Sequence, residues 1–402
     1  MPGTINATDK ARARRIKQHV IGREQRFFVV TPPGLEPLCQ RELMGLGIPP
    51  GDIVLRKGGL AFTGRLTACY QANLMCRTAG HILMRLQSFT ARHFDALEKH
   101  ARAIPWELYL STTTALEVRV SAHQSRLYHS DAVAERIFSA VKERLASGLP
   151  DDAGPIASEV PAQRIWARLH KDRVTLSLDS SGDHLHKRGL KTHGGPAPLR
   201  ETLAAAAMLL AGYDGSGILC DPMCGSGTFA VEAAMMVKRI PPGWYRTFAF
   251  MEWPAFRPAH WDYLRHQAAP RSNPLAAPLI YAADRSRTAV EQLAALLQGS
   301  DIEDAIDLQK KDFFGFTPPP LGSHRGVIAL NPPYGRRLGQ AAATPRLVGE
   351  ILHKLQRDFR GWQIILVLPE KRLLYQVPFT FKSHHTMHGG RPIWLVIGRV
   401  PL

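Results

Sequence analysis

The sequence lacks the features that mark secreted, membrane-spanning and metal-dependent proteins. Its cysteines have no spacing typical of a metal site, and we expect all five to be reduced thiols: Cys39, Cys69, Cys76, Cys220 and Cys224. No apolar stretch approaches the length of about 18 residues that a membrane span requires. The N-terminal residues are charged and contain no apolar segment of a secretory leader. These absences predict a cytoplasmic chain without a membrane segment or a bound metal.

Acidic side chains are also scarce. The 402 residues include 34 Asp and Glu against 51 Lys and Arg, which gives a formal net charge of +17. Such an excess favours a polyanionic partner such as nucleic acid. Residues 1–25 contribute a basic arm that we expect to be disordered, and both a phosphate-binding tail and a solvated leader stay open for it. The length and the 45% hydrophobic content suffice for two or three domains.

Hydrophobic spacing alternates between the periods of strands and helices. In the first half it predicts strands at 27–30, 60–62, 82–86 and 116–120, helices between them, and a hairpin of 165–170 with 173–178. In the second half, apolar strands near 218, 279, 327 and 364 alternate with helices, which predicts a parallel sheet. Residues 379–381 and 393–397 would close it as an antiparallel pair.

A short polar loop follows one of these buried strands. Residues 331–335 read Asn-Pro-Pro-Tyr-Gly and come after the apolar run 327–330. The prolines restrict φ, so the loop is stiff. The side-chain oxygen of Asn331 and the carbonyl of Pro332 can both accept hydrogen bonds from one exocyclic amino group, while Tyr334 stacks on the ring that carries it. This arrangement suits methylation of an amino group on a nucleobase, and a strand-ending turn with an aromatic plug is the alternative.

A glycine loop precedes it in the sequence. Residues 218–228 read as a strand running into Asp-Pro-Met-Cys-Gly-Ser-Gly-Thr, with a helix to follow. Gly225 and Gly227 let the backbone approach a ligand closely, and Asp221 at the strand end can hold an ammonium group. The loop has no Gly-Lys-Ser or Gly-Lys-Thr, which excludes a P-loop. A dinucleotide or phosphate would suit the glycines alone equally well.

Two acidic residues stand where the next strands should end. Asp284 follows an apolar strand, but an insertion of roughly 240–278 separates it from the glycine loop, a spacing that argues against NAD. Its carboxylate could hold the two ribose hydroxyls of S-adenosylmethionine. Asp312 could accept a hydrogen bond from the adenine amino group, with Phe313 packed near the ring. A loop acid or helix cap is the alternative for each.

These motifs in this order resemble the class I, S-adenosylmethionine-dependent RNA methyltransferases that carry a THUMP domain. Among them, the chain is most similar to the bacterial 23S rRNA guanine-N2 methyltransferases, a family once grouped with adenine-N6 DNA methylases. The resemblance covers about residues 26–402 and includes residues 31–38, 58–62, 178–189 and 197–205. The last two stretches distinguish this group from DNA methylases, which share the Asn-Pro-Pro-Tyr loop.

The resemblance implies an α/β fold in which a Rossmann-like class I methyltransferase domain follows ferredoxin-like and THUMP α+β domains. The expected limits are 1–25 for the arm, 26–90 for the ferredoxin-like domain, 91–190 for the THUMP domain and 191–402 for the methyltransferase domain. The cofactor S-adenosylmethionine should contact Asp221, Pro222, Gly225, Gly227, Thr228, Asp284, Asp312, Phe313 and Asn331. Catalysis is assigned to Asn331, Pro332 and Tyr334.

The implied reaction is direct displacement at the sulfonium methyl by the exocyclic nitrogen of a guanine. The implied partner is RNA, either 23S rRNA or a large-subunit precursor. Arg336 and Arg337 could hold flanking phosphates, and a solvated basic turn is the alternative for them. One rival function uses the same loop chemistry, namely adenine-N6 methylation of DNA or RNA. The other is a ribosome-assembly protein that binds RNA without needing methyl transfer. The sequence leaves the target nucleotide and the oligomeric state open.

Overall fold

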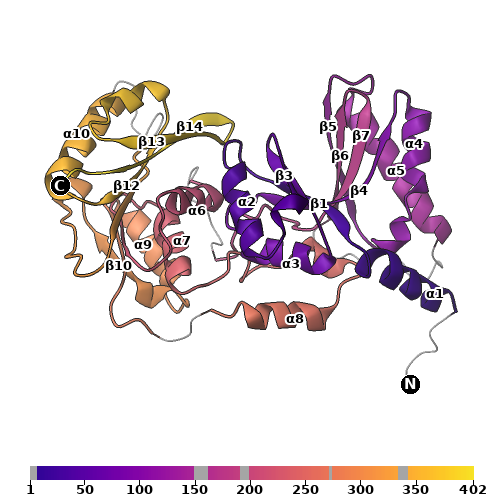
Figure 1. The fold of residues 1–402 in the computed structure, drawn as a ribbon, viewed down its shortest axis with the longest axis horizontal. Coiled ribbons are helices and arrows are strands. Elements are labelled where there is room, and N and C mark those ends of the chain that lie inside the picture. Colours follow the sequence, from indigo (N-terminus) through magenta and orange to yellow (C-terminus); the bar gives the residue numbers. More distant parts are fainter. Residues whose placement is uncertain (1–6, 149–161, 191–198, 271–273, 334–342) are drawn as a thin grey trace.

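Two seven-stranded sheets, one from each half of the chain, form the framework of the protein (Figure 1). The computed structural model describes residues 7–148, 162–190, 199–270, 274–333 and 343–402. The first sheet has the strand order β2-β3-β1-β4-β7-β6-β5 and the second the order β10-β9-β8-β11-β12-β14-β13. The expected mixed α/β architecture is confirmed.

The first four strands form a ferredoxin-like unit with the order βαββαβ. They are β1 (Gln25–Val30), β2 (Ile53–Arg56), β3 (Gly59–Gly64) and β4 (His81–Thr90), with α2 (Glu36–Gly45) and α3 (Leu66–Met75) between them. Sequence periodicity missed β2, whose last three residues are all exposed and show no alternation. Phe27 and Val29 of β1 lie in the core, while Phe28 between them points to the opposite side of the sheet.

The next elements extend the same sheet instead of starting a new one. They are α4 (Phe94–Ala103), β5 (Leu116–His123), α5 (Ser130–Gly148), β6 (Gln163–His170) and β7 (Arg173–Asp179). β4 pairs with β1 along one edge and with β7 along the other. The hairpin is confirmed, and Lys171 and Asp172 both have positive φ, as a tight two-residue turn requires. The ferredoxin-like and THUMP-like parts therefore share one continuous sheet.

The N-terminal arm differs from expectation. We predicted disorder over residues 1–25, but α1 (Ala7–Ile16) and a π-helical turn (Lys17–Ile21) are folded. Ile16 and Val20 are buried in the core of the first sheet. Arg12 donates from Nε to the carbonyl of Glu107 at 2.8 Å and from a terminal nitrogen to that of Leu110 at 3.0 Å. The helix forms because these long-range contacts satisfy its basic and apolar side chains together.

The second sheet is parallel through its first five strands, as predicted. These are β8 (Ile218–Asp221), β9 (Ile280–Asp284), β10 (Ile306–Lys310), β11 (Gly326–Leu330) and β12 (Gln363–Leu368). The expected antiparallel closing pair is β13 (Phe381–His388) with β14 (Arg391–Arg399), and β14 also pairs with β12. Helices α6 (Glu201–Leu210), α7 (Thr228–Val237), α9 (Arg287–Leu297) and α10 (Ala343–Asp358) pack around it.

The insertion between β8 and β9 crosses to the first half of the chain. It contains α8 (Pro258–Gln267), which Figure 1 shows beside α3 and away from the second sheet. Phe248, Phe250 and Trp261 are buried in the core of the first sheet, and Phe250 stacks on Tyr70 with ring centroids 4.3 Å apart. The two halves thus share a hydrophobic core through this insertion.

All five cysteines are free and buried. Among the described residues, no helix is both long and apolar enough to cross a membrane.

Candidate active site

A cavity of about 370 Å³ opens at the carboxyl ends of the parallel strands, where open α/β sheets bind ligands. Loops after β8, β9, β10 and β11 form most of its wall, and the start of α10 closes one side. The residues that line it are Pro222, Met223, Gly225, Asp284, Arg285, Asp312, Phe313, Phe314, Asn331, Pro333, Arg346, Leu347 and Glu350. Motifs distant in sequence meet here because the ends of parallel strands share one edge of a sheet.

The glycine loop forms one wall, and its conformation requires glycine. Gly225 has φ of +52°, and a Cβ there would meet no atom within 4 Å, so the backbone faces open space. Gly227 caps α7 with φ of +74°, and a Cβ on it would lie 2.5 Å from Cδ1 of Leu293. The loop is tied to β9 by the Cys224 amide, which donates to the carbonyl of Ala283 at 2.9 Å.

Asp284 connects the glycine loop with the turn after β9. Its Oδ2 accepts from the Gly225 amide at 2.8 Å, and its Oδ1 accepts from the Ser286 amide at 2.8 Å. Each carboxylate oxygen has a second lone pair, so both can still accept from hydroxyl groups of a ligand. The side chain is therefore held in one orientation while it remains available at the cavity wall.

Asp312 and Phe313 form the opposite wall. Oδ1 of Asp312 accepts from the Phe314 amide at 2.8 Å and so caps a short 3₁₀ turn. Phe313 is 2% exposed, which makes it a rigid part of the wall. Phe314 lines the same cavity but is 42% exposed at its edge. A flat aromatic ring placed between these groups would find a hydrogen-bond acceptor and an apolar face together.

Asn331 presents the most informative polar atom of the cavity. Its Oδ1 is buried, yet it has no hydrogen-bond donor among the residues that the structure describes. Burying an acceptor without a hydrogen-bond donor costs about 1–3 kcal/mol of folding free energy. A ligand that donates a hydrogen bond to this oxygen would remove that cost, which favours its binding. Pro333 lines the cavity beside it, whereas Pro332 is buried and outside the lining. Tyr334, Arg336 and Arg337 lie outside the described residues.

Three expected cofactor contacts, Asp221, Gly227 and Thr228, do not line the cavity. Asp221 is 1% exposed, its Oδ2 accepts from the Ala230 amide at 3.2 Å, and it is absent from the cavity lining. This hydrogen bond holds the first turn of α7. The carboxylate therefore does not stand at the cavity wall, where we expected it to contact an ammonium group. Thr228, the first residue of α7, is 5% exposed and also lies behind the wall. Burial raises the pKa of the neighbouring Cys220 thiol well above its usual range, so that thiol is un-ionised.

Several lining residues escaped the sequence motifs, chiefly those on α10. Arg346 and Glu350 form an ion pair of 2.9 Å one helical turn apart, and Leu347 lies beside them. Met223 lies within the glycine-loop motif but was given no role, and Arg285 follows Asp284 outside any motif. The i, i+4 spacing of Arg346 and Glu350, a short distance after the polar loop, is the signal that could have pointed to α10.

The cavity wall thus combines the carboxylates of Asp284 and Asp312 with the apolar side chain of Phe313. Asn331, with its buried and unpartnered amide oxygen, lines the same cavity among the described residues. A doubly wound sheet with this combination defines a class I methyltransferase.

Comparison with known proteins agrees with this class. Three family models match consecutive parts of the chain: an RlmL ferredoxin-like domain over residues 26–83, a THUMP domain over 91–179 and an RMKL-like methyltransferase domain over 188–384. Candidate RNA methyltransferase slr0064 of Synechocystis sp. is 31% identical, over 92% of this chain and 95% of that protein. The chain therefore belongs to the RMKL-like methyltransferase family whose members carry a THUMP domain.

Two further relatives are informative. Ribosomal RNA large subunit methyltransferase K/L of Methylococcus capsulatus is 33% identical, over 90% of this chain and 50% of that protein. The chain thus spans about half the length of the K/L relatives it matches. The crystal structure of SMU.472, a candidate methyltransferase in complex with SAH, has a TM-score of 0.82 at 27% identity and covers 94% of this chain. SAH is the product that S-adenosylmethionine leaves after methyl transfer.

Proposed function

We propose that this chain transfers a methyl group from S-adenosylmethionine to the exocyclic N2 amino group of a guanine in 23S rRNA or its precursor. The buried, unpartnered Oδ1 of Asn331 carries the proposal, because the cavity holds a hydrogen-bond acceptor that needs a donor from a ligand. The names of the K/L relatives support a large-subunit rRNA substrate, and the complex of SMU.472 supports the cofactor.

The described residues suit the cofactor. Asp284 would accept from the ribose hydroxyls, because its two oxygens each keep a free lone pair after bonding the backbone. Asp312 would accept from the adenine amino group, and Phe313 would pack against the adenine ring. Gly225 leaves room for the methionine portion, since no atom occupies the position of a Cβ. The bound cofactor supplies an electrophilic methyl on a sulfonium, and the protein fixes its direction.

Asn331 and Pro332 act on the attacking nitrogen. The N2 lone pair of guanine is delocalised into the ring, so the nitrogen is a poor nucleophile. Hydrogen bonds from its two N–H groups to Asn331 Oδ1 and the Pro332 carbonyl favour a pyramidal nitrogen and stabilise positive charge as it develops. Tyr334 would stack on the guanine. The loop 331–335 includes no Asp or Glu, and the amino proton leaves after the methyl has been transferred.

The N-terminal half selects the RNA in this proposal. A pocket of nucleotide size contacts one base and cannot distinguish among the many guanines of a large RNA. Selection therefore requires contacts elsewhere, and the match to a THUMP domain over residues 91–179 supports this half as their source. The guanine must come from an unpaired segment or leave its helix to reach the cavity.

The test compares two variants of the full chain on 23S rRNA that lacks the modification. Asn331→Ala should lower methyl transfer by about 100-fold or more while the affinity for SAH, measured by calorimetry, stays within about threefold. Gln267→Ala removes an exposed amide at the end of α8 and should leave both unchanged. A wild-type chain that fails to bind SAH would contradict the proposed cofactor. Equal rates for Asn331→Ala and wild type would exclude the loop as the catalytic element.

Nucleoside mass spectrometry of the product decides the acceptor atom. N2-methylguanosine is the expected product. N6-methyladenosine would instead establish the rival adenine activity, since an adenine amino group can satisfy Asn331 in the same way. If neither appears while RNA still binds, the chain is an RNA-binding assembly protein.

A further inference from the structure

The sheet of the N-terminal half has one face covered by helices and one free face. Alternate residues of its strands, such as Val29, Met84 and Leu176, lie in the core beneath α2 to α5. Their neighbours therefore point to the opposite face. There the structure has a hollow of about 640 Å³, the larger of its two described cavities, lined by parts of β1, β4, β5, β6 and β7 and by the β2–β3 turn.

The hollow is basic, and among the described residues its lining offers no counter-charge. Lys57, Arg85 and Arg168 line it, and the lining includes no aspartate or glutamate. Arg56, at the end of β2, adds a fourth positive charge near Arg85. Burial, reinforced by Arg168 and Arg56, lowers the pKa of Arg85 from its usual value. Three guanidinium groups gathered around one hollow repel one another, and an anion bound among them would relieve that repulsion.

Arg85 lines the hollow and keeps an unused hydrogen-bond donor. Its Nε is buried and donates to no acceptor among the described residues. The guanidinium carbon lies over the Phe28 ring, 4.4 Å from its centre, in a cation–π contact that anchors the side chain. An arginine anchored in this way still has the terminal nitrogens of its guanidinium for phosphate oxygens.

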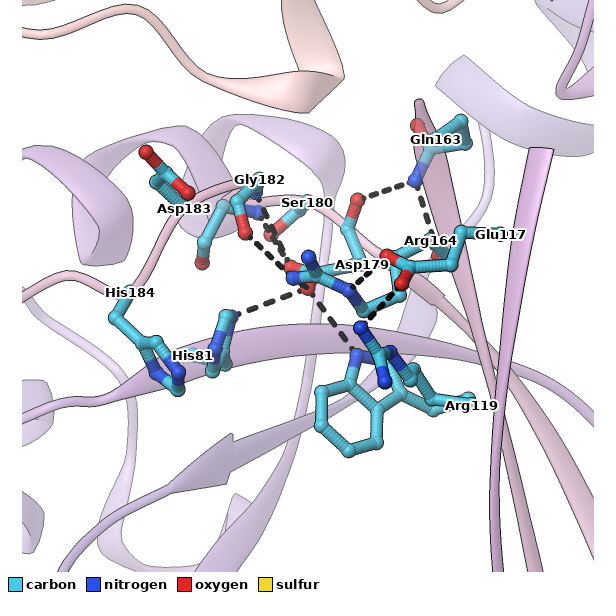
Figure 2. A network of polar contacts seen from close by, with 12 residues as sticks. His81, Glu117, Arg119, Gln163, Arg164, Asp179, Ser180, Gly182, Asp183 and His184 are labelled. Atoms are coloured by element: carbon cyan, nitrogen blue, oxygen red, sulfur yellow. Dashed lines mark hydrogen bonds and ion pairs between the residues drawn. The ribbon is translucent and has the colours of Figure 1, made fainter. Parts of the chain in front are cut away.

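The other end of the same sheet face is electrically balanced (Figure 2). Glu117 pairs with both Arg119 and Arg164. Asp179 accepts from Trp166 Nε1 at 3.1 Å and from the Ser181 amide at 2.9 Å. These two carboxylates neutralise their end through internal contacts. The basic lining of the hollow therefore contrasts with this balanced end of the same sheet face.

Flat rings lie beside the unpaired charges. The Trp166 side chain borders the hollow between the balanced end and the basic end. His123 and His170 are parallel within 3°, with ring centroids 5.6 Å apart, and both belong to the lining. Positive groups interleaved with aromatic rings are the combination that binds the phosphates and bases of single-stranded nucleic acid.

We infer that this hollow binds an unpaired segment of the RNA substrate, with phosphates on Arg56, Arg85 and Arg168 and bases against Trp166 and the His123–His170 pair. The inference rests on the proposed function, because it assumes an RNA substrate, and it locates a second contact with that RNA away from the methyl-transfer cavity. A duplex presents phosphates and groove edges but keeps its base faces stacked. Its bases could not reach rings that lie within a hollow, so an unpaired segment fits better.

The test uses the full chain and two fluorescein-labelled probes, a 12-nucleotide oligouridine and a 12-base-pair RNA duplex. The variant Arg56→Glu/Arg168→Glu reverses two charges that repel Arg85, so its stability should not fall. The control Arg41→Glu/Arg239→Glu makes the same charge change at arginines outside the hollow. His123→Ala/His170→Ala removes the parallel ring pair. Affinity for SAH is measured for every variant.

Wild type should bind the single strand more tightly than the duplex. The Arg56/Arg168 variant should bind it at least about tenfold more weakly, and the slope of log affinity against log salt should fall by about 0.7 for each phosphate that the protein no longer neutralises. The histidine variant should bind the single strand at least about fivefold more weakly than wild type. Its salt slope should change little, because stacking involves no net charge. The Arg41/Arg239 control should change affinity less than about twofold.

Three results would overturn the inference. If the control weakened single-strand binding as much as the Arg56/Arg168 variant, net charge alone would explain the effect. Equal binding of duplex and single strand would exclude an unpaired segment. Poly-glutamate serves as a further probe: if the Arg56/Arg168 variant lost affinity for it by the same factor as for the single strand, the hollow would be a site for acidic proteins. Normal SAH affinity in these variants separates all three results from a failure of the proposed methyltransferase function, in which wild type would not bind SAH.

Discussion

Replacing Glu232 by glutamine would test what joins the two halves of the molecule. Glu232 lies on α7 with 0% exposure, directly after the glycine loop. Its Oε1 accepts from Nε of Arg188 at 2.7 Å, and its Oε2 lies 3.5 Å from a terminal nitrogen of Arg77. Arg188 belongs to the connection between the halves and Arg77 to the ferredoxin-like unit. One carboxylate on α7 thus holds two arginines from two other parts of the chain.

The magnitude follows from burial. Arg188 is 4% exposed, so the substitution leaves a guanidinium without its counter-charge and out of reach of water. Removing one partner of a buried ion pair typically costs about 3–5 kcal/mol. Glutamine keeps the shape and one acceptor oxygen, which places the expected decrease in stability near the lower end, at about 3 kcal/mol. The Arg188 guanidinium still donates to the backbone carbonyls of Leu185 and Arg77, both at 2.8 Å, but these acceptors have no negative charge to balance it.

The control is Glu291→Gln on α9. Glu291 pairs with Arg287 one turn away, but the two side chains are 60% and 77% exposed. Exposed pairs of this kind contribute about 0.5 kcal/mol or less, so the control should be nearly neutral. Urea unfolding followed by tryptophan fluorescence measures the stability. Hydrogen exchange of residues 185–190 and α7 shows whether local unfolding begins at the joint, meaning the contacts of Glu232 with Arg188 and Arg77 that connect the two halves.

The reasoning would be refuted in two ways. Glu232→Gln could unfold at the same urea concentration as wild type, which would mean that the charge contributes nothing at the joint. Alternatively, exchange could increase evenly along the chain, which would mean that the network does not connect the halves in particular.

Three further changes have outcomes that the structure specifies. Gly227→Ala, at the start of α7, should lower SAH affinity by at least about tenfold, because the new Cβ would lie 2.5 Å from Cδ1 of Leu293 on α9. Gly299→Ala, with a similar φ of +70° but no atom within 4 Å, should cost about 1–2 kcal/mol of stability and leave the affinity unchanged in calorimetry. Asp284→Asn should weaken SAH binding by about tenfold, because an amide nitrogen replaces one acceptor shared by the loop and the ligand. Stability should fall as the pH is lowered from about 6.5 towards 4, because burial, reinforced by His81, lowers the pKa of His184 to about 4, and the unfolded chain then binds more protons. Burial and His184 lower the pKa of His186 to about 3. His184→Gln/His186→Gln should flatten that dependence in thermal unfolding at pH 4 to 7, and a profile as steep as that of wild type would assign the effect to other groups.

The joint also alters how the halves can be studied. The domain limits expected from the sequence would allow residues 191–402 to be studied apart from 26–190. The structure shows Phe248, Phe250 and Trp261 of the second half buried in the core of the first, and separation would expose them together with Glu232. Full-length variants therefore test the division of labour more cleanly than truncation does.

The sequence by itself determined the parallel sheet and the meeting of its strand ends. Apolar runs define β8, β9 and β11, and the residues after such runs must lie along one edge, so Gly225, Asp284 and Asn331 could be grouped from the sequence. Strand and turn chemistry are local, which is why the hairpin at Lys171 was also predicted correctly.

Only the tertiary structure decided which side chains face the cavity and how the halves join. Asp221 ends the same kind of strand as Asp284, yet it turns inward to Ala230 because the start of α7 lies over it. The folded arm at Arg12, the sheet shared through β4, and the unpaired Arg85 all arise from contacts between residues far apart in the chain. Such contacts leave no periodic pattern, because each partner taken alone resembles an ordinary surface or core residue.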